Sequence, residues 1–396
     1  MTETPLVELG AVILGLALLA RLAARVGIPA IPFYLLGGLA VGEGGLVPLG
    51  ATEDFARTGA EIGIVLLLFS LGLEYSATEL FTAMRASLPA GLLNLAANYS
   101  VGLAAGLLLG WGLVPAMFLG GVTFVTSTGV MAQVMADLRW TGNRETPVVL
   151  SISIMEDLTM VLYLPVLGAL ALGGAGLAGS LVAVTAVAAV SVILILALRF
   201  EHAISRALYT RSDEALLLSL LGIVVLAAGL ADSIRVSAAV GALLAGIVLS
   251  GPTADRARGL LPPLRHLFAA IFFLFIGLEI DPASIPPMVA PALALAAIGV
   301  VTKAGTGWWA ARASGIGAAG QARAAALLIP RGEFSIALAG LAVSAGLEPK
   351  LAPLTIAYVI VLVVIGPIAA RLAVPIARGL QARSARRRAA QAPPVA

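Results

Sequence analysis

Long apolar runs are the dominant feature of this 396-residue sequence. About 20 mostly apolar residues are enough for a helix to cross a bilayer, and we recognise thirteen such runs. Six precede a central run at about 175–199, which we expect to be a linker helix, and six follow it. The runs lie near 6–24, 29–42, 58–73, 87–110, 114–136 and 147–170, then near 212–231, 236–250, 264–280, 288–311, 320–345 and 351–373.

The composition agrees with a membrane location. Hydrophobic residues make up 60% of the chain and charged residues 11%, whereas soluble domains carry about 25% charged residues. This excludes a soluble cytosolic enzyme. The sequence therefore predicts an all-α membrane protein with about 13 transmembrane helices and short loops.

The basic residues predict the orientation, because cytoplasmic loops are enriched in Lys and Arg. With the N-terminus outside, nineteen of the 24 basic residues fall in inner gaps or the C-terminal tail, and three (Arg57, Arg235 and Lys350) fall outside. We expect a multi-pass protein of the plasma (inner) membrane with a cytoplasmic C-terminus. The expected domains are a transmembrane domain over 1–380 and a short basic tail over 381–396, which contacts lipid headgroups rather than nucleic acid.

Several classes of site are excluded by residue counts. The chain has no cysteine and two histidines, so thiolate metal sites and His-rich zinc or iron sites are not expected. No cofactor is expected. The first residues lack a basic segment and a small-residue cleavage site, and we expect no removable signal peptide.

The two halves of the chain resemble each other at one offset. Leu71-Gly72-Leu73-Glu74 is matched 205 residues later by Ile276-Gly277-Leu278-Glu279, and Thr126–Val130 is matched by Arg331–Ser335. With six runs per half and one linker between them, equivalent helices have opposite orientations. Inverted repeats with paired interrupted helices are typical of secondary transporters. We therefore expect repeats over about 6–170 and 212–373.

Charged residues within the apolar runs are the candidate functional residues, because charge at membrane depth is costly. Glu156 and Asp157 are about 100° apart on a helix, so one can face a pathway while the other faces a partner helix. Lys303 lies too deep to reach the interface and requires an acidic partner, for which either carboxylate is suitable.

Two polar segments are expected to interrupt helices. Thr126, Ser127 and Thr128 offer hydroxyl and carbonyl oxygens for a cation, and we expect the fifth run to break at Thr126–Gly129. Such backbone is tolerated at membrane depth where it lines a cavity or is buried in protein. Arg331 and Glu333 interrupt the twelfth run, where they can neutralise opposing helix ends.

On these residues the chain resembles the monovalent cation:proton antiporters, and most closely their second branch, which includes the Kef potassium-efflux and Nap sodium antiporters. The resemblance extends over roughly residues 10–375. It is carried by Ala60–Glu74, Ser127-Thr128 with Gln133, Val240–Gly246, Phe272-Phe273 through Asp281, Lys303, and Gly332-Glu333-Phe334.

The resemblance implies a homodimer with crossed, interrupted helices and elevator-like alternating access. It also implies that Asp157 binds the ion, and that Lys303 pairs with the preceding carboxylate. Glu156 occupies a position that is Asp in sodium-type members and Gln in Kef proteins, so sodium and potassium both stay open. No Kef-type nucleotide-binding domain follows the last run, and we expect no gating by such a domain in cis.

Other functional classes make different demands on the sequence. A sodium-coupled organic-anion symporter shares the inverted-repeat architecture, but it needs no set of Glu156, Asp157 and Lys303. An intramembrane aspartyl protease requires a Gly-x-Gly-Asp string, which is absent. A channel needs no protonatable switch. The expected function is therefore exchange of Na⁺ or K⁺ for protons, and not an enzymatic reaction.

Overall fold

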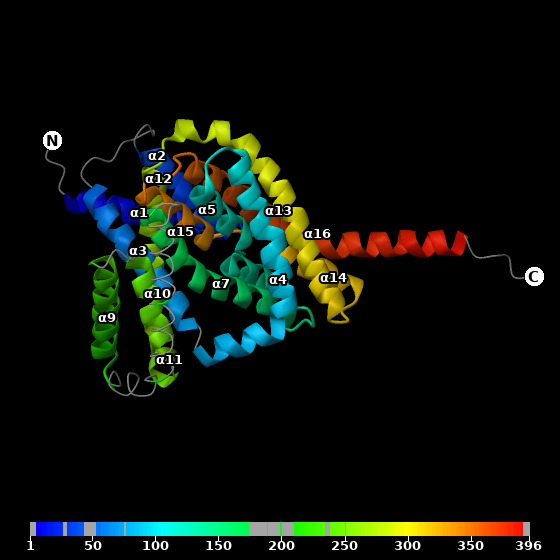
Figure 1. Cartoon of the computed structure of the whole chain (residues 1–396), viewed down its shortest axis with the longest axis horizontal. Coiled ribbons are helices and arrows are strands. Elements are labelled where there is room, and N and C mark those ends of the chain that lie inside the picture. Colours follow the sequence, from blue (N-terminus) through cyan, green and yellow to red (C-terminus); the bar gives the residue numbers. More distant parts are fainter. Residues whose placement is uncertain are drawn as a thin grey trace, which may run out of the picture.

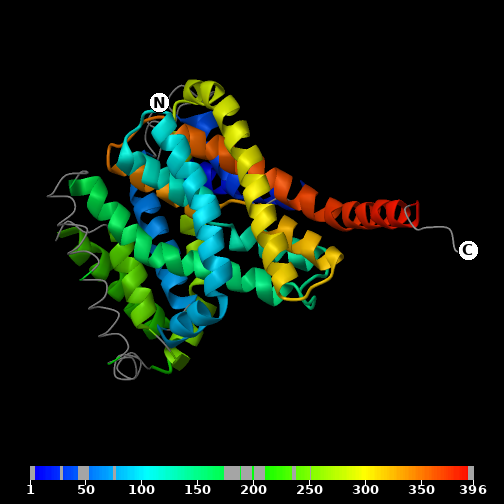
Figure 2. The same ribbon diagram turned by 45° about the vertical axis from the view of Figure 1, so that its right-hand side comes forward.

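The computed structural model of the chain describes residues 5–26, 30–42, 53–74, 77–173, 210–233, 238–249 and 251–390, together with residues 188 and 199. Every regular element within these residues is a helix, and they contain no strand. The helices pack into two groups that lie side by side (Figures 1 and 2).

The first group surrounds α3 and α12. Its members are α1 (Pro5–Val26), α2 (Ile31–Val41), α3 (Glu53–Glu74), α9 (Asp213–Ser233), α10 (Ala238–Val248), α11 (Gly251–Leu260) and α12 (Pro262–Leu278). We call this group the panel. Proline in the first turn of α2 and α12 begins each helix, because the missing N–H has no intrahelical partner there.

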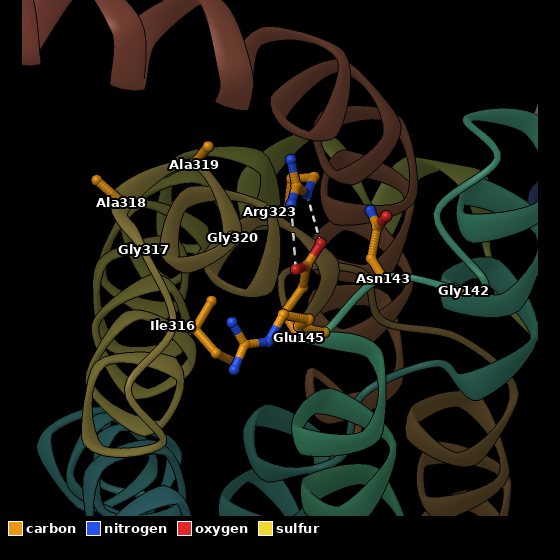
Figure 3. A pocket seen from close by; sticks show the side chains of 10 residues that line it. Gly142, Asn143, Glu145, Ile316, Gly317, Ala318, Ala319, Gly320 and Arg323 are labelled. Atoms are coloured by element: carbon orange, nitrogen blue, oxygen red, sulfur yellow. Dashed lines mark hydrogen bonds and ion pairs between the residues drawn. The ribbon is translucent and has the colours of Figure 1, made fainter.

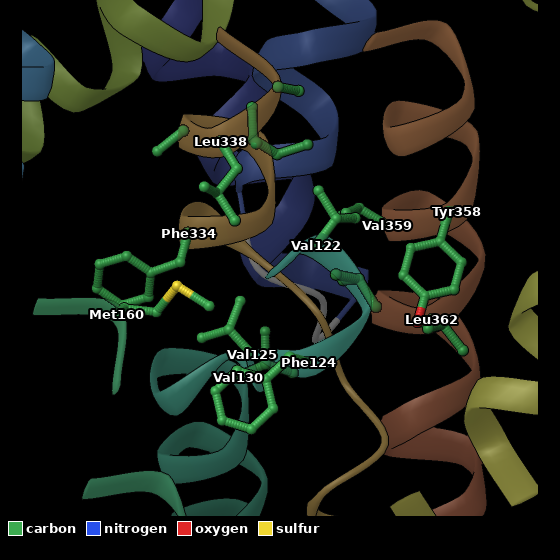
Figure 4. Close-up of a cluster of buried hydrophobic side chains, with 14 of the residues drawn as sticks. Val122, Phe124, Val125, Val130, Met160, Phe334, Leu338, Tyr358, Val359 and Leu362 are labelled. Atoms are coloured by element: carbon green, nitrogen blue, oxygen red, sulfur yellow. The ribbon is translucent and has the colours of Figure 1, made fainter. Parts of the chain in front are cut away.

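The second group contains the long helices α4 and α13. Its members are α4 (Ala77–Leu108), α5 (Leu113–Phe124), α6 (Thr128–Asp137), α7 (Thr146–Gly173), η1 (Pro282–Ser284), α13 (Pro286–Ala313), α14 (Ala318–Leu327), α15 (Glu333–Ser344) and α16 (Leu351–Ala390). We call this group the core bundle. Apolar side chains from α5, α6, α7, α15 and α16 are buried together at its centre (Figure 4).

Glycines allow close contacts between panel helices. A Cβ added to Gly72 would lie 2.2 Å from the carbonyl oxygen of Leu243 and 2.9 Å from the Cα of Gly246, so α3 and α10 touch backbone to backbone. Gly38 and Gly277 bring α2 and α12 together in the same way. Small residues at such crossings are a common means of packing helices in membranes.

Twelve of the thirteen expected runs contain helices at the expected positions. The linker run at 175–199 lies outside the described residues, apart from residues 188 and 199. Within the described residues, six helices are long and apolar enough to cross a membrane, or seven if the bent pair of α11 and α12 forms one span. The chain is thus a multi-pass membrane protein, and the full count of about 13 stays a prediction.

Two features differ from the expected layout. The segment 251–260, expected to be a loop, forms the separate helix α11, which meets α12 at a 54° bend. The last helix does not end near residue 373. It continues to Ala390 through the first part of the basic tail and projects from the core bundle (Figure 1).

Candidate functional site

Two interrupted helices meet in the core bundle. Residues 125–127 separate α5 from α6, and residues 328–332 separate α14 from α15. Both interruptions were expected, and the first lies slightly before the expected Thr126–Gly129. The Ser127 N–H donates to the Pro330 carbonyl oxygen over 3.0 Å, so the two breaks are in contact.

Arg331 and Glu333 lie at helix ends of opposite polarity. The buried Arg331 guanidinium donates to the carbonyl oxygens of Leu328 and Ile329, just beyond α14, and to that of Thr123 at the end of α5, at 2.8–3.2 Å. Glu333 begins α15 and accepts a 2.9 Å hydrogen bond from the hydroxyl of Ser127, the N-cap residue of α6. A positive charge thus faces helix C-termini and a negative charge faces helix N-termini, the arrangement that helix dipoles favour.

Glu156 is the acidic partner of Lys303. The two side chains are fully buried and form an ion pair between α7 and α13. Thr126 joins the pair, since its N–H donates to Glu156 Oε2 over 2.5 Å and its Oγ1 accepts from Lys303 Nζ over 3.0 Å. Burial of an ion pair is tolerated only with such additional hydrogen bonds.

Asp157 points in another direction from α7 and lines a cavity of about 440 Å³ between the panel and the core bundle. Its side chain is almost fully buried, with 1% exposed. Side chains from both breaks share this cavity with it. They are Ser127, Thr128 and Glu333, and the opposite wall is formed by Tyr34, Leu67, Arg265, His266 and Phe273.

The three residues expected to offer oxygen atoms to a cation, Thr126, Ser127 and Thr128, point in three directions. Thr128 is directed to Asp157, with its Oγ1 3.5 Å from Asp157 Oδ2 and 2.8 Å from the Ser153 hydroxyl. Ser127 caps α6 and donates to Glu333. Thr126 faces Glu156 and Lys303 instead of the cavity. The structure therefore brings all eight candidate residues to one region. Thr126, Glu156 and Lys303 form the ion-pair site, Ser127, Thr128, Asp157 and Glu333 line the cavity, and Arg331 binds the helix ends at the breaks.

Four further polar residues of this region were not predicted from the sequence. Ser153 precedes Asp157 by one helical turn and contacts Thr128. Asn94 and Asn98 lie on α4 and join Glu156 to Thr302 on α13. Asparagines four residues apart in an apolar run were a usable signal, since i and i+4 share one helix face.

A second ion pair joins the two halves of the chain at the end of the core bundle. Glu145, the residue before α7, accepts hydrogen bonds from Arg323 on α14, beside a cavity of about 510 Å³ (Figure 3). Burial alone would raise the pKa of the Glu145 carboxyl. Hydrogen bonds from Arg323 and the backbone, together with the positive charge of Arg323, outweigh that effect and hold the pKa below its ordinary value.

Known proteins resemble this chain over nearly its whole length. Residues 12–374 match the family model described as sodium/hydrogen exchanger, transmembrane. The K(+)/H(+) antiporter subunit KhtU of Bacillus subtilis is 30% identical over 370 residues, which are 91% of each chain. The ammonium/H(+) antiporter subunit AmhT of Alkalihalophilus pseudofirmus is 29% identical over 86% of this chain and 87% of its own.

A solved structure has the same fold. The sodium proton antiporter MjNhaP1 from Methanocaldococcus jannaschii matches with a TM-score of 0.68 over 94% of this chain and 97% of its own, at 18% sequence identity. The helical arrangement in Figures 1 and 2 is therefore similar to that of a known antiporter.

Proposed function

Because the chain belongs to the sodium/hydrogen exchanger family, we propose that it exchanges sodium or potassium ions for protons, with Asp157 as the group for which the two compete. One observation carries the proposal. The Asp157 carboxylate is buried at the wall of the cavity between panel and core bundle, with the hydroxyl of Thr128 within reach.

The chemistry of the cavity suits this exchange. A buried carboxylate that loses its water requires either a proton or a cation to neutralise it. Asp157, Thr128 and Ser127 line the same cavity. Their side chains carry carboxylate and hydroxyl oxygens, which hard cations prefer. Binding one ion at Asp157 then displaces the other, which couples the two fluxes.

Alternating access is proposed to follow from the division into two groups of helices. Asp157 belongs to the core bundle, and the opposite wall of its cavity belongs to α2, α3 and α12 of the panel. Sliding of the core bundle along the panel would carry Asp157 from one membrane face to the other, as an elevator does. The panel would remain fixed in a homodimer, with the N-terminus outside and the C-terminus in the cytoplasm.

The inverted repeats are part of the same proposal. The contact of Gly38 on α2 with Gly277 on α12 has a counterpart in the contact of Gly246 on α10 with Gly72 on α3. Under the repeat, α2 corresponds to α10 and α3 to α12, so each contact is the image of the other. This correspondence supports the assignment of repeats to about 6–170 and 212–373.

Transport by the purified full chain in proteoliposomes tests the proposal. Adding Na⁺ or K⁺ outside vesicles with an acidic lumen should raise the luminal pH for at least one of the two cations. NH₄⁺ is tested as well, in view of the ammonium antiporter AmhT. The Asp157→Asn variant should fold and show no exchange. Exchange by this variant at the wild-type rate would contradict the role of Asp157, and failure of the wild type with both Na⁺ and K⁺ would contradict the function.

A further inference from the structure

The panel side of the cavity carries an arginine to which the proposed exchange gives no role. Arg265, the fourth residue of α12, lines this cavity opposite Asp157. Its Nη2 lies 3.3 Å from Nε2 of the neighbouring His266. Within the described part of the chain Arg265 forms no ion pair. Its positive charge therefore acts on the cavity without a carboxylate partner to neutralise it.

The structure of α12 does not account for a basic residue at this position. A helix N-terminus carries a positive partial charge and favours acidic side chains, yet Arg265 and His266 follow directly on the first turn. Arg265 is partly buried and His266 is exposed, whereas Asp157 is only 1% exposed. Arg265 thus lies between the surface and the more deeply buried carboxylate.

The core side of the same cavity has the opposite charge. It contributes two carboxylates, those of Asp157 and Glu333, and the hydroxyl of Thr128. Glu333 accepts a hydrogen bond from the neutral Ser127 hydroxyl, which leaves its negative charge in place. Carboxylates and neutral oxygens are also the ligands of Ca²⁺ and Mg²⁺. Because Coulomb attraction is proportional to the charge of the ion, the core side alone would favour a divalent cation over a monovalent one.

We propose that Arg265 is a specificity-determining residue, whose positive charge disfavours divalent cations at Asp157 relative to Na⁺ or K⁺. This rests on the proposed function. One guanidinium offsets one of the two carboxylate charges, and it repels a divalent ion twice as strongly as a monovalent ion at the same place. The site thereby loses a little affinity for its own cation and gains discrimination against the other class, which is how a repulsive element produces specificity.

The dependence on ionic charge provides the test. Arg265→Gln should raise the apparent affinity for the transported monovalent cation roughly threefold, the effect of one charge at about 10 Å in an effective dielectric of about 50. The affinity for a divalent ion should rise by the square of that factor, about ninefold. Both values come from exchange in proteoliposomes, with Ca²⁺ added as a competitor, since Ca²⁺ accepts irregular oxygen sets and Mg²⁺ sheds its water reluctantly. Arg265→Lys keeps the charge and should match the wild type.

Arg312→Gln is the matched control. Arg312 is an exposed arginine of α13 that lies over the Trp308 ring and does not line the cavity, so neither affinity should change. His266→Glu places a negative charge beside Arg265 and should raise the Ca²⁺ affinity more than that for the monovalent cation. At pH 8, where an ordinary imidazole is neutral, His266→Gln should have no effect. If Arg265→Gln does not fold, the comparison of these two His266 variants decides.

Three results would overturn the proposal. They are an unchanged Ca²⁺ affinity in Arg265→Gln, an equal factor for both ions, which a change of cavity shape would produce, and an Arg265→Lys variant that behaves like Arg265→Gln.

A binding measurement does not depend on transport. Thermal stabilisation of the purified full chain by CaCl₂, compared with choline chloride at equal ionic strength, reports binding to the folded protein. Arg265→Gln should respond at about ninefold lower Ca²⁺ concentration, and adding Asp157→Asn should abolish the response. A response that survives Asp157→Asn would place the divalent ion elsewhere and overturn the proposal. Absence of exchange by the wild type would instead overturn the proposed function, and the binding of Na⁺, K⁺ and Ca²⁺ would still test Arg265.

Discussion

Four donated hydrogen bonds surround the Glu156 carboxylate, whereas the Asp157 carboxylate faces the cavity with the Thr128 hydroxyl 3.5 Å away. The difference arises because successive residues of α7 point about 100° apart. Glu156 is therefore directed to α4 and α13, and Asp157 to the panel. One carboxylate is suited to an ion pair with Lys303 and the other to exchange.

Replacing Thr128 by Val is expected to weaken cation binding without lowering the maximal rate. The substitution removes a hydroxyl that lies 3.5 Å from Asp157 Oδ2 and keeps the shape of the side chain. We expect the apparent cation affinity to fall roughly fivefold, the equivalent of about 1 kcal/mol for one hydrogen bond, when proton flux is measured against cation concentration.

Thr355→Val is the control for this substitution. Thr355 is buried in α16, and its hydroxyl donates to the Leu351 carbonyl oxygen within the same helix, so its loss should not change the affinity. An unchanged affinity in Thr128→Val would mean that the cation is held by other oxygens. Ser127→Ala should instead reduce stability, by about 1 kcal/mol, because Ser127 caps α6.

The sequence could predict the charged residues of the site, but not which carboxylate forms the ion pair and which lines the cavity. Glu156, Asp157 and Lys303 are conspicuous because each is a charge within an apolar run. Which carboxylate pairs with Lys303 depends on how α7 is rotated against α13, and that rotation is set by packing. Asn94, Asn98 and Ser153 were missed because uncharged polar residues are common in membrane helices, where their partners lie on other helices.

At the scale of elements, the interrupted helices were predictable because polar and glycine-containing strings stand in the middle of apolar runs. The helix α11 was not, because its charged residues resemble those of an inner loop. The glycine contacts were not predictable either. Gly72 and Gly246 are two of 44 glycines, and only the packing of α3 against α10 distinguishes them from glycines with free space around them.

Gly246→Ala is expected to separate α3 from α10. Its Cβ would lie 2.3 Å from the carbonyl oxygen of Phe69 and 2.9 Å from the Cα of Gly72, and backbone atoms cannot move aside individually. We expect a loss of about 1–3 kcal/mol, typical of overpacking, measured as a lower unfolding temperature in detergent. Gly222→Ala in α9 has nothing within 4 Å and should be neutral or stabilising, since alanine favours a helix. Equal stability of the two variants would contradict the close contact.

The Glu145 and Arg323 pair is expected to make the stability depend on acidic pH. The pKa of Glu145 is lowered from 4.5 in the folded protein. The contribution of the pair is therefore complete above that ordinary value and is lost as the pH falls through the lowered folded value. Glu145→Gln should be less stable at neutral pH by roughly 1–3 kcal/mol, and its unfolding temperature should fall less than that of the wild type on acidification.

The exposed ion pair of Arg258 with Asp255 provides the control. Exposed pairs contribute little, so Asp255→Asn should keep the wild-type stability at neutral pH and the wild-type response to acid. If Glu145→Gln loses stability on acidification as steeply as the wild type, the carboxylates responsible for that loss lie elsewhere in the chain.

At the scale of the whole molecule, the site lies where two groups of helices meet. The Glu156 and Lys303 pair is enclosed within the core bundle, while Asp157 lies at its boundary with the panel. Under the proposed elevator movement, an ion bound at Asp157 would travel with the core bundle, and so would the ion pair. The charge carried across the membrane in each step would then depend on both sites.

Transport is expected to be electrogenic if Lys303 releases its proton when a cation binds at Asp157. Two protons would then exchange for one monovalent cation, and one net charge would cross the membrane per cycle. A potential of 100 mV supplies about 2.3 kcal/mol per charge, enough for a roughly 50-fold cation gradient. Proteoliposomes with equal pH on both sides and a clamped potential should therefore accumulate Na⁺ or K⁺ in the direction opposite to the proton flux.

In Lys303→Gln, Glu156 would take up a proton because its buried charge lacks a partner, and exchange should become one for one and insensitive to voltage. Absence of voltage-driven accumulation by the wild type would contradict the second proton and leave the role of Asp157 unchanged.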